Sequence, residues 1–167
     1  MLQVPARFEY EVATSVDEAI SLLQRHGPEA QILAGGHSLI PMMRLRLAVP
    51  EVLVDIHKLD DELRYVRDED GVLKIGALAR HRDVLGSELI EERYALLGEA
   101  ETLIADPLVR NMGTVGGSLA NGDPGEDLPA ALVALGCEVV ARGPDGERTI
   151  AVDELYADFY ETILEPG

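Results

Sequence analysis

The chain has 167 residues, 47% of them hydrophobic, and its 14 Lys and Arg against 31 Asp and Glu give a formal net charge of −17. This length suits one domain or two small lobes, and the apolar content argues against disorder. The negative charge disfavours binding to nucleic acids or anionic membrane surfaces. A single cysteine, Cys137, excludes an intrachain disulfide and a cysteine-rich metal site. No apolar run approaches the ~20 residues of a membrane span, and residues 1–7 do not resemble a signal peptide, so we expect a cytoplasmic protein.

The first third of the chain alternates predicted strands and helices. Short strands are expected at residues 8–12, 31–34 and 52–56. Between the first two, Ser15 and Glu18 form a capping box that begins a helix, and Gly27 and Pro28 end it. Ser38 is expected to cap a short helix before the third strand. This order favours a small parallel sheet.

Beyond about residue 58 the pattern changes to hairpins and helices. Hairpin signals at residues 68–71 and 143–146 each separate two β-rich segments, the first pair being 63–66 and 72–75. Helical spacing is found at residues 81–85, 94–104 and 127–135. This part is expected to be an antiparallel sheet with helices packed on it. Residues 161–167 begin a strand-like segment and stop, which suggests a longer parent chain.

Two glycine-rich stretches are the strongest signals for function. The first glycine loop, residues 34–38, lies between a predicted strand and a predicted helix; the second, residues 114–118, holds paired glycines flanked by Thr114 and Ser118. Glycine permits close approach and positive φ, so successive amide groups can point into one concavity and bind an anion. Two such loops suggest a site for a pyrophosphate.

Each signal also has an ordinary structural interpretation. The Gly35-Gly36 pair alone is a common turn, and neither loop has the Rossmann or Walker spacing. His37 is as readily structural as functional, and Asp127 is either a helix N-cap or a carboxylate that binds ligand hydroxyls. His57 and His81 have no partner at metal-ligand spacing. With no evident catalytic side chain, a bound cofactor would supply the chemistry.

Residues 33–41, 45–48, 50–56 and 106–118 together resemble the FAD-binding medium subunit of molybdenum hydroxylases, the family of aerobic carbon monoxide dehydrogenase and xanthine dehydrogenase. The resemblance extends over essentially the whole chain. His37 replaces a common glutamine, and Leu108 and Met112 replace a usual glutamine and arginine, whereas the glycines and hydroxyls are intact. Family members continue into a further C-terminal domain that is absent from this sequence.

The resemblance implies an α+β, two-lobed FAD-binding fold of the PCMH (vanillyl-alcohol-oxidase-like) type. A small α/β lobe would span residues 1–57, and a larger antiparallel-sheet lobe with helices would span residues 58–167. The two glycine loops would hold the FAD pyrophosphate, Asp127 would contact the ribityl side and Ile104 would lie near adenine. The implied cofactor-binding residues are Leu33, Ala34, Gly35, Gly36, His37, Ser38, Ile104, Thr114, Val115, Gly116, Gly117, Ser118 and Asp127.

The implied function is electron transfer. A molybdenum-binding large subunit would oxidise the substrate, an iron–sulfur small subunit would pass electrons to FAD on this chain, and an external acceptor would take them. The implied assembly is a dimer of heterotrimers, in which this chain, an oxidoreductase subunit, is inactive alone and holds no metal. The alternatives are a self-contained flavin oxidase or reductase on the same fold, and a FAD-free assembly module or fragment.

Overall fold

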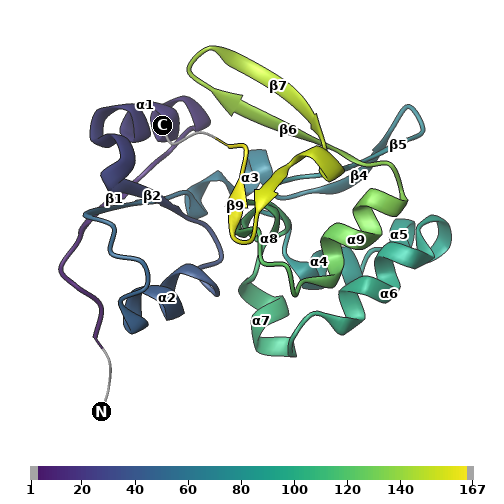
Figure 1. Cartoon of the computed structure of the whole chain (residues 1–167). Coiled ribbons are helices and arrows are strands. Elements are labelled where there is room, and N and C mark those ends of the chain that lie inside the picture. The colour runs from purple at the N-terminus through teal and green to yellow at the C-terminus, as the bar shows by residue number, and fades with distance from the viewer. Residues whose placement is uncertain (1–3, 165–167) are drawn as a thin grey trace.

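The computed structural model describes residues 4–164 (Figure 1). The expectation for the end of the sequence therefore falls partly outside the described residues, since only residues 161–164 of that segment are included. The chain begins with a parallel three-stranded sheet and continues into helices and hairpins that lie beside it.

The predicted parallel sheet is confirmed. Its strand order is β1-β3-β2, with Val52 of the central strand opposite Glu9 on one side and Ala30 on the other. All four residues of the central strand are buried: the apolar run Val52–Val54, as expected, and also Asp55. The elements of this part are β1 (Glu9–Val12), α1 (Val16–His26), the 3₁₀ turn η1 (Gly27–Glu29), β2 (Ala30–Leu33), α2 (Leu39–Leu45) and β3 (Val52–Asp55).

Two capping predictions for this part are correct only in part. The Ser15 side chain accepts a hydrogen bond from the Glu18 amide, and α1 ends at Gly27 as expected. The Glu18 carboxylate, however, accepts from the amide and hydroxyl of Thr14, so the reciprocal bond of the capping box is displaced by one residue. Ser38 occupies the N-cap position of α2 but its side chain makes no capping hydrogen bond.

The second part is more helical than the sequence indicates. The first predicted hairpin is present, but its first strand starts at Val66, because Leu63 belongs to a short helix. The elements here are the turn η2 (His57–Leu59), α3 (Asp60–Leu63), β4 (Val66–Glu69), β5 (Val72–Ile75), α4 (His81–Leu85), α5 (Glu88–Arg93), α6 (Ala95–Leu103), α7 (Pro107–Met112), α8 (Val115–Asn121), α9 (Asp127–Ala134), β6 (Glu138–Gly143), β7 (Gly146–Ala151), the turn η3 (Val152–Glu154), β8 (Tyr156–Asp158) and β9 (Glu161–Thr162).

The expected antiparallel sheet does not form among the described residues. The strands pair as three separate two-stranded sheets, β4-β5, β6-β7 and β8-β9. The first four residues of β7 are exposed, so this hairpin has little apolar face with which to join a larger sheet. Helices supply most of the packing instead. Asp127 is the first residue of α9 and Glu126 holds the N-cap position, so the N-cap interpretation of Asp127 is also wrong.

Separate hydrophobic clusters support the two parts. One lies around the sheet and includes Val54 and Leu22, and the other lies among the helices and includes Leu97 and Leu128. Leu78 belongs to the cluster around the sheet, so the chain beyond residue 58 helps to cover that sheet.

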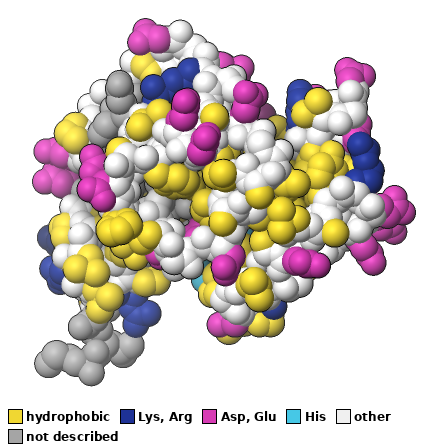
Figure 2. Space-filling view, turned by 45° about the vertical axis from the view of Figure 1, so that its right-hand side comes forward, with side chains coloured by type: hydrophobic (Ala, Val, Ile, Leu, Met, Phe, Trp, Pro, Cys, Tyr) yellow, Lys and Arg dark blue, Asp and Glu magenta, His cyan; other side chains and the backbone are white. Residues whose placement is uncertain are grey.

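The surface reflects the composition. Acidic side chains are spread around the face shown in Figure 2, and hydrophobic side chains gather in its middle. No helix in the described part of the chain has both the length and the apolar character to cross a membrane.

Candidate functional site

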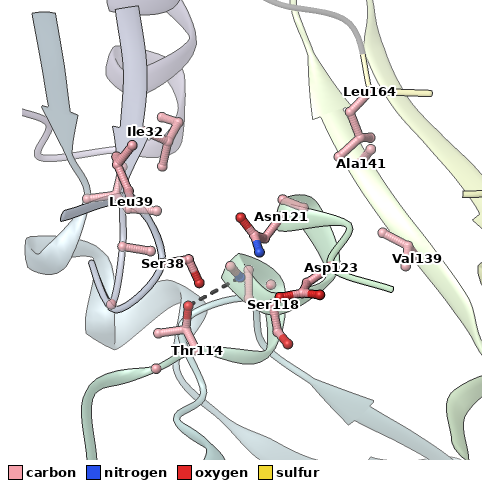
Figure 3. Close-up of a pocket in the computed structure, with 18 of the residues that line it drawn as sticks. Ile32, Ser38, Leu39, Thr114, Ser118, Asn121, Asp123, Val139, Ala141 and Leu164 are labelled. Atoms are coloured by element: carbon pink, nitrogen blue, oxygen red, sulfur yellow. Dashed lines mark hydrogen bonds between the residues drawn. The ribbon is translucent and has the colours of Figure 1, made fainter. Parts of the chain in front are cut away.

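A large cleft of about 1010 Å³ separates the sheet from the C-terminal hairpins. Its size is at the upper end of the range typical of small-molecule sites. In Figure 3, residues of the sheet and α2 lie on one side of the cleft, residues of β6 together with Leu164 lie on the other, and α8 with the loop after it lies between them. The labelled residues are Ile32, Ser38, Leu39, Thr114, Ser118, Asn121, Asp123, Val139, Ala141 and Leu164.

The structure brings most of the sequence-predicted residues to this cleft. Two of the thirteen do not line it: Leu33 packs against the small cluster of Leu39 and Met43, and Val115 is buried among the helices. The residues that line the cleft are Ala34, Gly35, Gly36, His37, Ser38, Ile104, Thr114, Gly116, Gly117, Ser118 and Asp127.

The two glycine loops meet through backbone contact. A Cβ built on Gly35 would lie 2.3 Å from the Met112 carbonyl oxygen and 3.0 Å from the Gly113 Cα, so only glycine fits there. Gly36 has a φ of +73°, a conformation that L side chains rarely adopt. The glycines of the first loop therefore permit both its turn and its approach to the second loop.

The first loop has free main-chain donors. Within residues 4–164, the amides of Gly35, Gly36, His37 and Ser38 have no hydrogen-bond partner. They lie just before the first turn of α2, whose Ile40 amide bonds to the Gly36 carbonyl. Unpaired amides at the start of a helix are suited to an anion.

The second loop uses its amides internally, which corrects the expectation that both loops offer amide donors. The Val115 amide donates to the Ala79 carbonyl (2.9 Å) and the Gly116 amide to the Ala77 carbonyl (2.9 Å). The Gly117 amide donates to the Thr114 Oγ1 at 3.2 Å, the bond drawn in Figure 3. This loop therefore contributes close approach and hydroxyl groups rather than a cluster of free amides.

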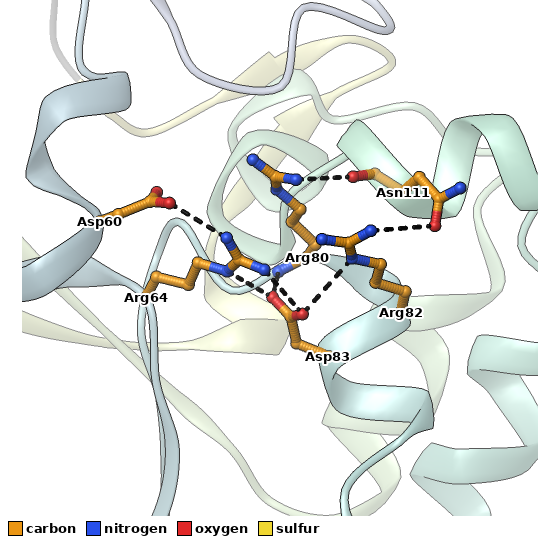
Figure 4. Close-up of polar contacts among 6 residues, drawn as sticks. All are labelled: Asp60, Arg64, Arg80, Arg82, Asp83 and Asn111. Carbon is orange, nitrogen blue, oxygen red and sulfur yellow. Dashed lines mark hydrogen bonds and ion pairs between the residues drawn. The ribbon is translucent and has the colours of Figure 1, made fainter.

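An arginine network holds the second loop from behind (Figure 4). Arg80 donates to the Asn111 carbonyl at 3.1 Å, and Arg64 makes two bonds to Asp83. Burial raises the pKa of Asp83, but bonds from Arg64 and the Arg80 amide outweigh it and hold the pKa below its ordinary value. Sequence reasoning missed this network because its members lie in or next to three different helices, α3, α4 and α7.

Ile104, which the resemblance predicts to lie near adenine, belongs to a strained segment between α6 and α7. Ile104 lines the cleft, and the next residue, Ala105, has a φ of +39°. Arg110 donates to the Ile104 carbonyl at 2.7 Å, and the Asp106 side chain caps α7. These bonds fix the position of Ile104 at the cleft.

Part of the far wall of the cleft is apolar and was also missed, while the rest of it, on the β6–β7 hairpin, carries charged side chains such as Arg142 and Glu147. Val139 and Ala141 are half-buried residues of β6 that alternate with exposed ones, and Leu164 follows β9. The alternation was visible in the sequence, but periodicity alone does not show what an apolar strand face will contact.

A carboxylate lies at the floor of the cleft beside the second loop. Ser118 donates a hydrogen bond to Glu126, and burial raises the pKa of this carboxyl group above its ordinary value. Asp127 also lines the cleft but is exposed. The cleft is not strongly basic, so an anion there depends on the amides of the first loop.

Replacement of Glu126 by Gln should stabilise the fold at high pH. Folded Glu126 holds its proton to a higher pH than the unfolded residue, so the stability it contributes is complete below the unfolded pKa and is lost as pH rises through the folded pKa. The Glu126→Gln chain should melt a few degrees higher than the parent at pH 8 and no higher at pH 4. Asp127→Asn, at the exposed neighbour, controls for loss of one negative charge. Equal melting temperatures at pH 8 would contradict this account.

No group of three or more His, Cys, Asp or Glu side chains among the described residues is placed to hold a metal ion. The arrangement instead offers an elongated cleft with amides at one wall, hydroxyls at the floor and apolar side chains opposite.

Comparisons with known proteins agree with this geometry. The family described as FAD binding domain in molybdopterin dehydrogenase matches residues 6–167. The carbon monoxide dehydrogenase medium chains of Hydrogenophaga pseudoflava and Afipia carboxidovorans are 48% and 43% identical and match 97% and 98% of this chain. The chain spans 56% and 57% of those two proteins. The structure of the carbon monoxide dehydrogenase from Hydrogenophaga pseudoflava that lacks the Mo-pyranopterin moiety superimposes with a TM-score of 0.94 at 48% identity, over 97% of this chain and 56% of that one.

Proposed function

Because the chain belongs to the family of FAD-binding domains in molybdopterin dehydrogenases, we propose that the cleft between the two glycine loops binds FAD. The observation that carries this proposal is the meeting of the loops: Gly35 contacts the segment that enters the second loop, and both loops line one cleft. The 1010 Å³ volume is ample for a dinucleotide.

The residues present fit the parts of this cofactor. The free amides of residues 35–38 suit the diphosphate, and the Thr114 hydroxyl at the floor, which accepts from the Gly117 amide and keeps its own hydrogen, can complete its hydrogen bonds. The apolar wall of Val139, Ala141 and Leu164 suits a flat aromatic ring and excludes water from it. Asp127, on the ribityl side, and Ile104, near adenine, stay predictions that the family resemblance supports.

The proposed role is electron transfer in a larger complex. FAD, when bound, accepts and passes on electrons, and this chain binds it, orients it and shields one face. The relatives' name, medium chain of carbon monoxide dehydrogenase, supports the presence of other subunits, and the Mo-pyranopterin moiety named for the structural relative supports molybdenum in that enzyme. From the family resemblance, the proposed partners are a molybdenum-binding large subunit and an iron–sulfur small subunit, in a dimer of heterotrimers. Electrons would pass from the iron–sulfur subunit to FAD and on to an external acceptor, in the cytoplasm.

The finer description of the fold belongs to the same proposal. A PCMH-type fold with lobes at residues 1–57 and 58–167 is supported by the separate hydrophobic clusters and by the cleft between the parts. Leu59 and Leu78 pack with the first cluster, so in this description the second lobe also covers the sheet of the first.

Titration of the purified chain with FAD tests the proposal. We expect saturable quenching of flavin fluorescence with one FAD per chain. The same sample should not turn over oxidisable substrates alone, because the proposed site of substrate oxidation lies in the molybdenum-binding subunit. Turnover by the isolated chain would favour the self-contained flavin enzyme. No change in flavin fluorescence or absorption would favour the FAD-free module and contradict the proposal.

A further inference from the structure

A buried His–Glu pair lies directly behind the junction of the two glycine loops. His81, the first residue of α4, is 3% exposed, and Glu101 of α6 is fully buried. The His81 Nδ1 lies 3.0 Å from the Glu101 Oε2. The other Glu101 oxygen, Oε1, has no hydrogen-bond partner among the described residues. A buried carboxylate with one unpaired oxygen depends strongly on the partner it has.

The imidazole of His81 abuts the residue at which the loops meet. A Cβ on Gly113 would lie 3.0 Å from the His81 Cδ2 and 3.3 Å from its Nε2, while a Cβ on Gly35 would lie 3.0 Å from the Gly113 Cα. Gly113 is therefore held between the ring and the first loop. The His81 amide also donates to the Gly113 carbonyl at 3.2 Å. Any movement of the ring would shift the contact between the loops.

The charges around this junction are mostly negative. Glu126, bonded to Ser118, lies close enough to sense both His81 and Glu101, and burial is the main reason that its pKa is raised. Asp123 and Tyr156 also lie near Glu126. His81 is the basic group at this end of the cleft, and it lines the cleft floor. Without it, the buried Glu101 and the half-buried Glu126 would underlie a site proposed for an anion.

We propose that His81 and Glu101 are positioning residues: a hydrogen-bonded pair that fixes Gly113 at the loop junction and keeps the buried Glu101 carboxyl group partnered beneath a site proposed for a diphosphate. The inference rests on the proposed function, because FAD binding is its readout. It predicts that an unpartnered Glu101 carboxylate, rather than the loss of either side chain by itself, lowers the affinity for FAD. His81→Gln leaves Glu101 as a buried, unpaired carboxylate, whereas His81→Gln with Glu101→Gln restores neutrality at nearly the same volume.

The test is a double-mutant cycle on FAD affinity, measured by fluorescence titration of the 167-residue chain. His81→Gln should weaken FAD binding at least about tenfold, whereas Glu101→Gln and the double variant should stay within about threefold of the parent. His26→Gln is the matched control, since His26 forms a half-buried pair with Glu11, neither residue lines the cleft, and the change should leave affinity unchanged. If the double variant loses at least the product of the single losses, the pair acts through packing and the inference is wrong.

The cycle remains decisive if one variant fails to fold. Should His81→Gln alone unfold, a folded double variant that binds FAD supports the inference, because removal of the unpartnered Glu101 carboxylate has restored binding. An unfolded double variant contradicts the inference. The titration of the parent chain tests the proposed function separately. If the parent binds FAD and all the variants bind it with equal affinity, only this inference is wrong. If the parent binds no FAD, the proposed function fails, and thermal unfolding of the same four chains still shows whether neutralising Glu101 rescues His81→Gln.

Discussion

Gly35→Ala should weaken the binding of FAD severely. The added methyl group would lie 2.3 Å from the Met112 carbonyl oxygen, and main-chain atoms on both sides leave it no room. The two loops must then separate, at a cost of about 2 kcal/mol or more, which is the usual cost of overpacking a close contact. We expect a loss in FAD affinity of roughly 30-fold or greater, since ~1.4 kcal/mol is a factor of ten. Fluorescence titration measures the affinity, and circular dichroism shows whether the chain stays folded.

Gly143→Ala is the matched control for this result. Gly143 also lines the cleft, but a Cβ there would meet nothing within 4 Å, and its φ is not positive. This variant should bind FAD as the parent does. If Gly35→Ala bound as tightly as Gly143→Ala, the close approach of the loops would have no part in binding.

Gly117→Asp should abolish FAD binding, for reasons that combine shape and charge. A Cβ at Gly117 would lie 2.7 Å from the Thr114 Oγ1, which accepts the bond that caps α8. The new carboxylate would lie at the proposed diphosphate site, where like charges repel with little solvent to screen them. We expect no detectable affinity at concentrations that saturate the parent.

Gly117→Asn separates the two effects, because it has the same shape as Gly117→Asp without the charge. Its affinity should fall measurably but stay well above that of Gly117→Asp, and the difference should shrink at high salt. Equal affinities for the Asn and Asp variants would mean that no phosphate lies near this loop.

The sequence predicted the local elements and the pairing of the two loops. Ser15, Gly27 and the buried run of β3 correctly indicated a helix and a parallel sheet, because caps and apolar runs act over a few neighbouring residues. Gly35-Gly36 and Gly116-Gly117 do line one cleft, as two anion-binding loops would require. FAD contact by each of the thirteen predicted residues remains a prediction.

The use of the amides could not be predicted from the sequence. Both loops offer main-chain amides, yet in the second loop the Gly116 amide bonds to Ala77 and the Val115 amide to Ala79, residues 39 and 36 positions earlier in the chain. Hydrogen-bond partners at such separations depend on tertiary packing, which local patterns do not encode. For the same reason the sequence did not show that the hairpins stay separate, because turn signals predict pairing within a hairpin and not between hairpins. The dependence on tertiary packing also explains why His81 and Glu101, 20 residues apart, gave no signal as a pair.

The most direct test is the structure of this chain crystallised with FAD. The account predicts that the diphosphate oxygens lie within hydrogen-bond distance of the amides of residues 35–38 and of the Thr114 or Ser118 hydroxyl, with the flavin ring against the apolar wall. A diphosphate bound away from residues 35–38, or crystals grown in saturating FAD that contain none in the cleft, would contradict it.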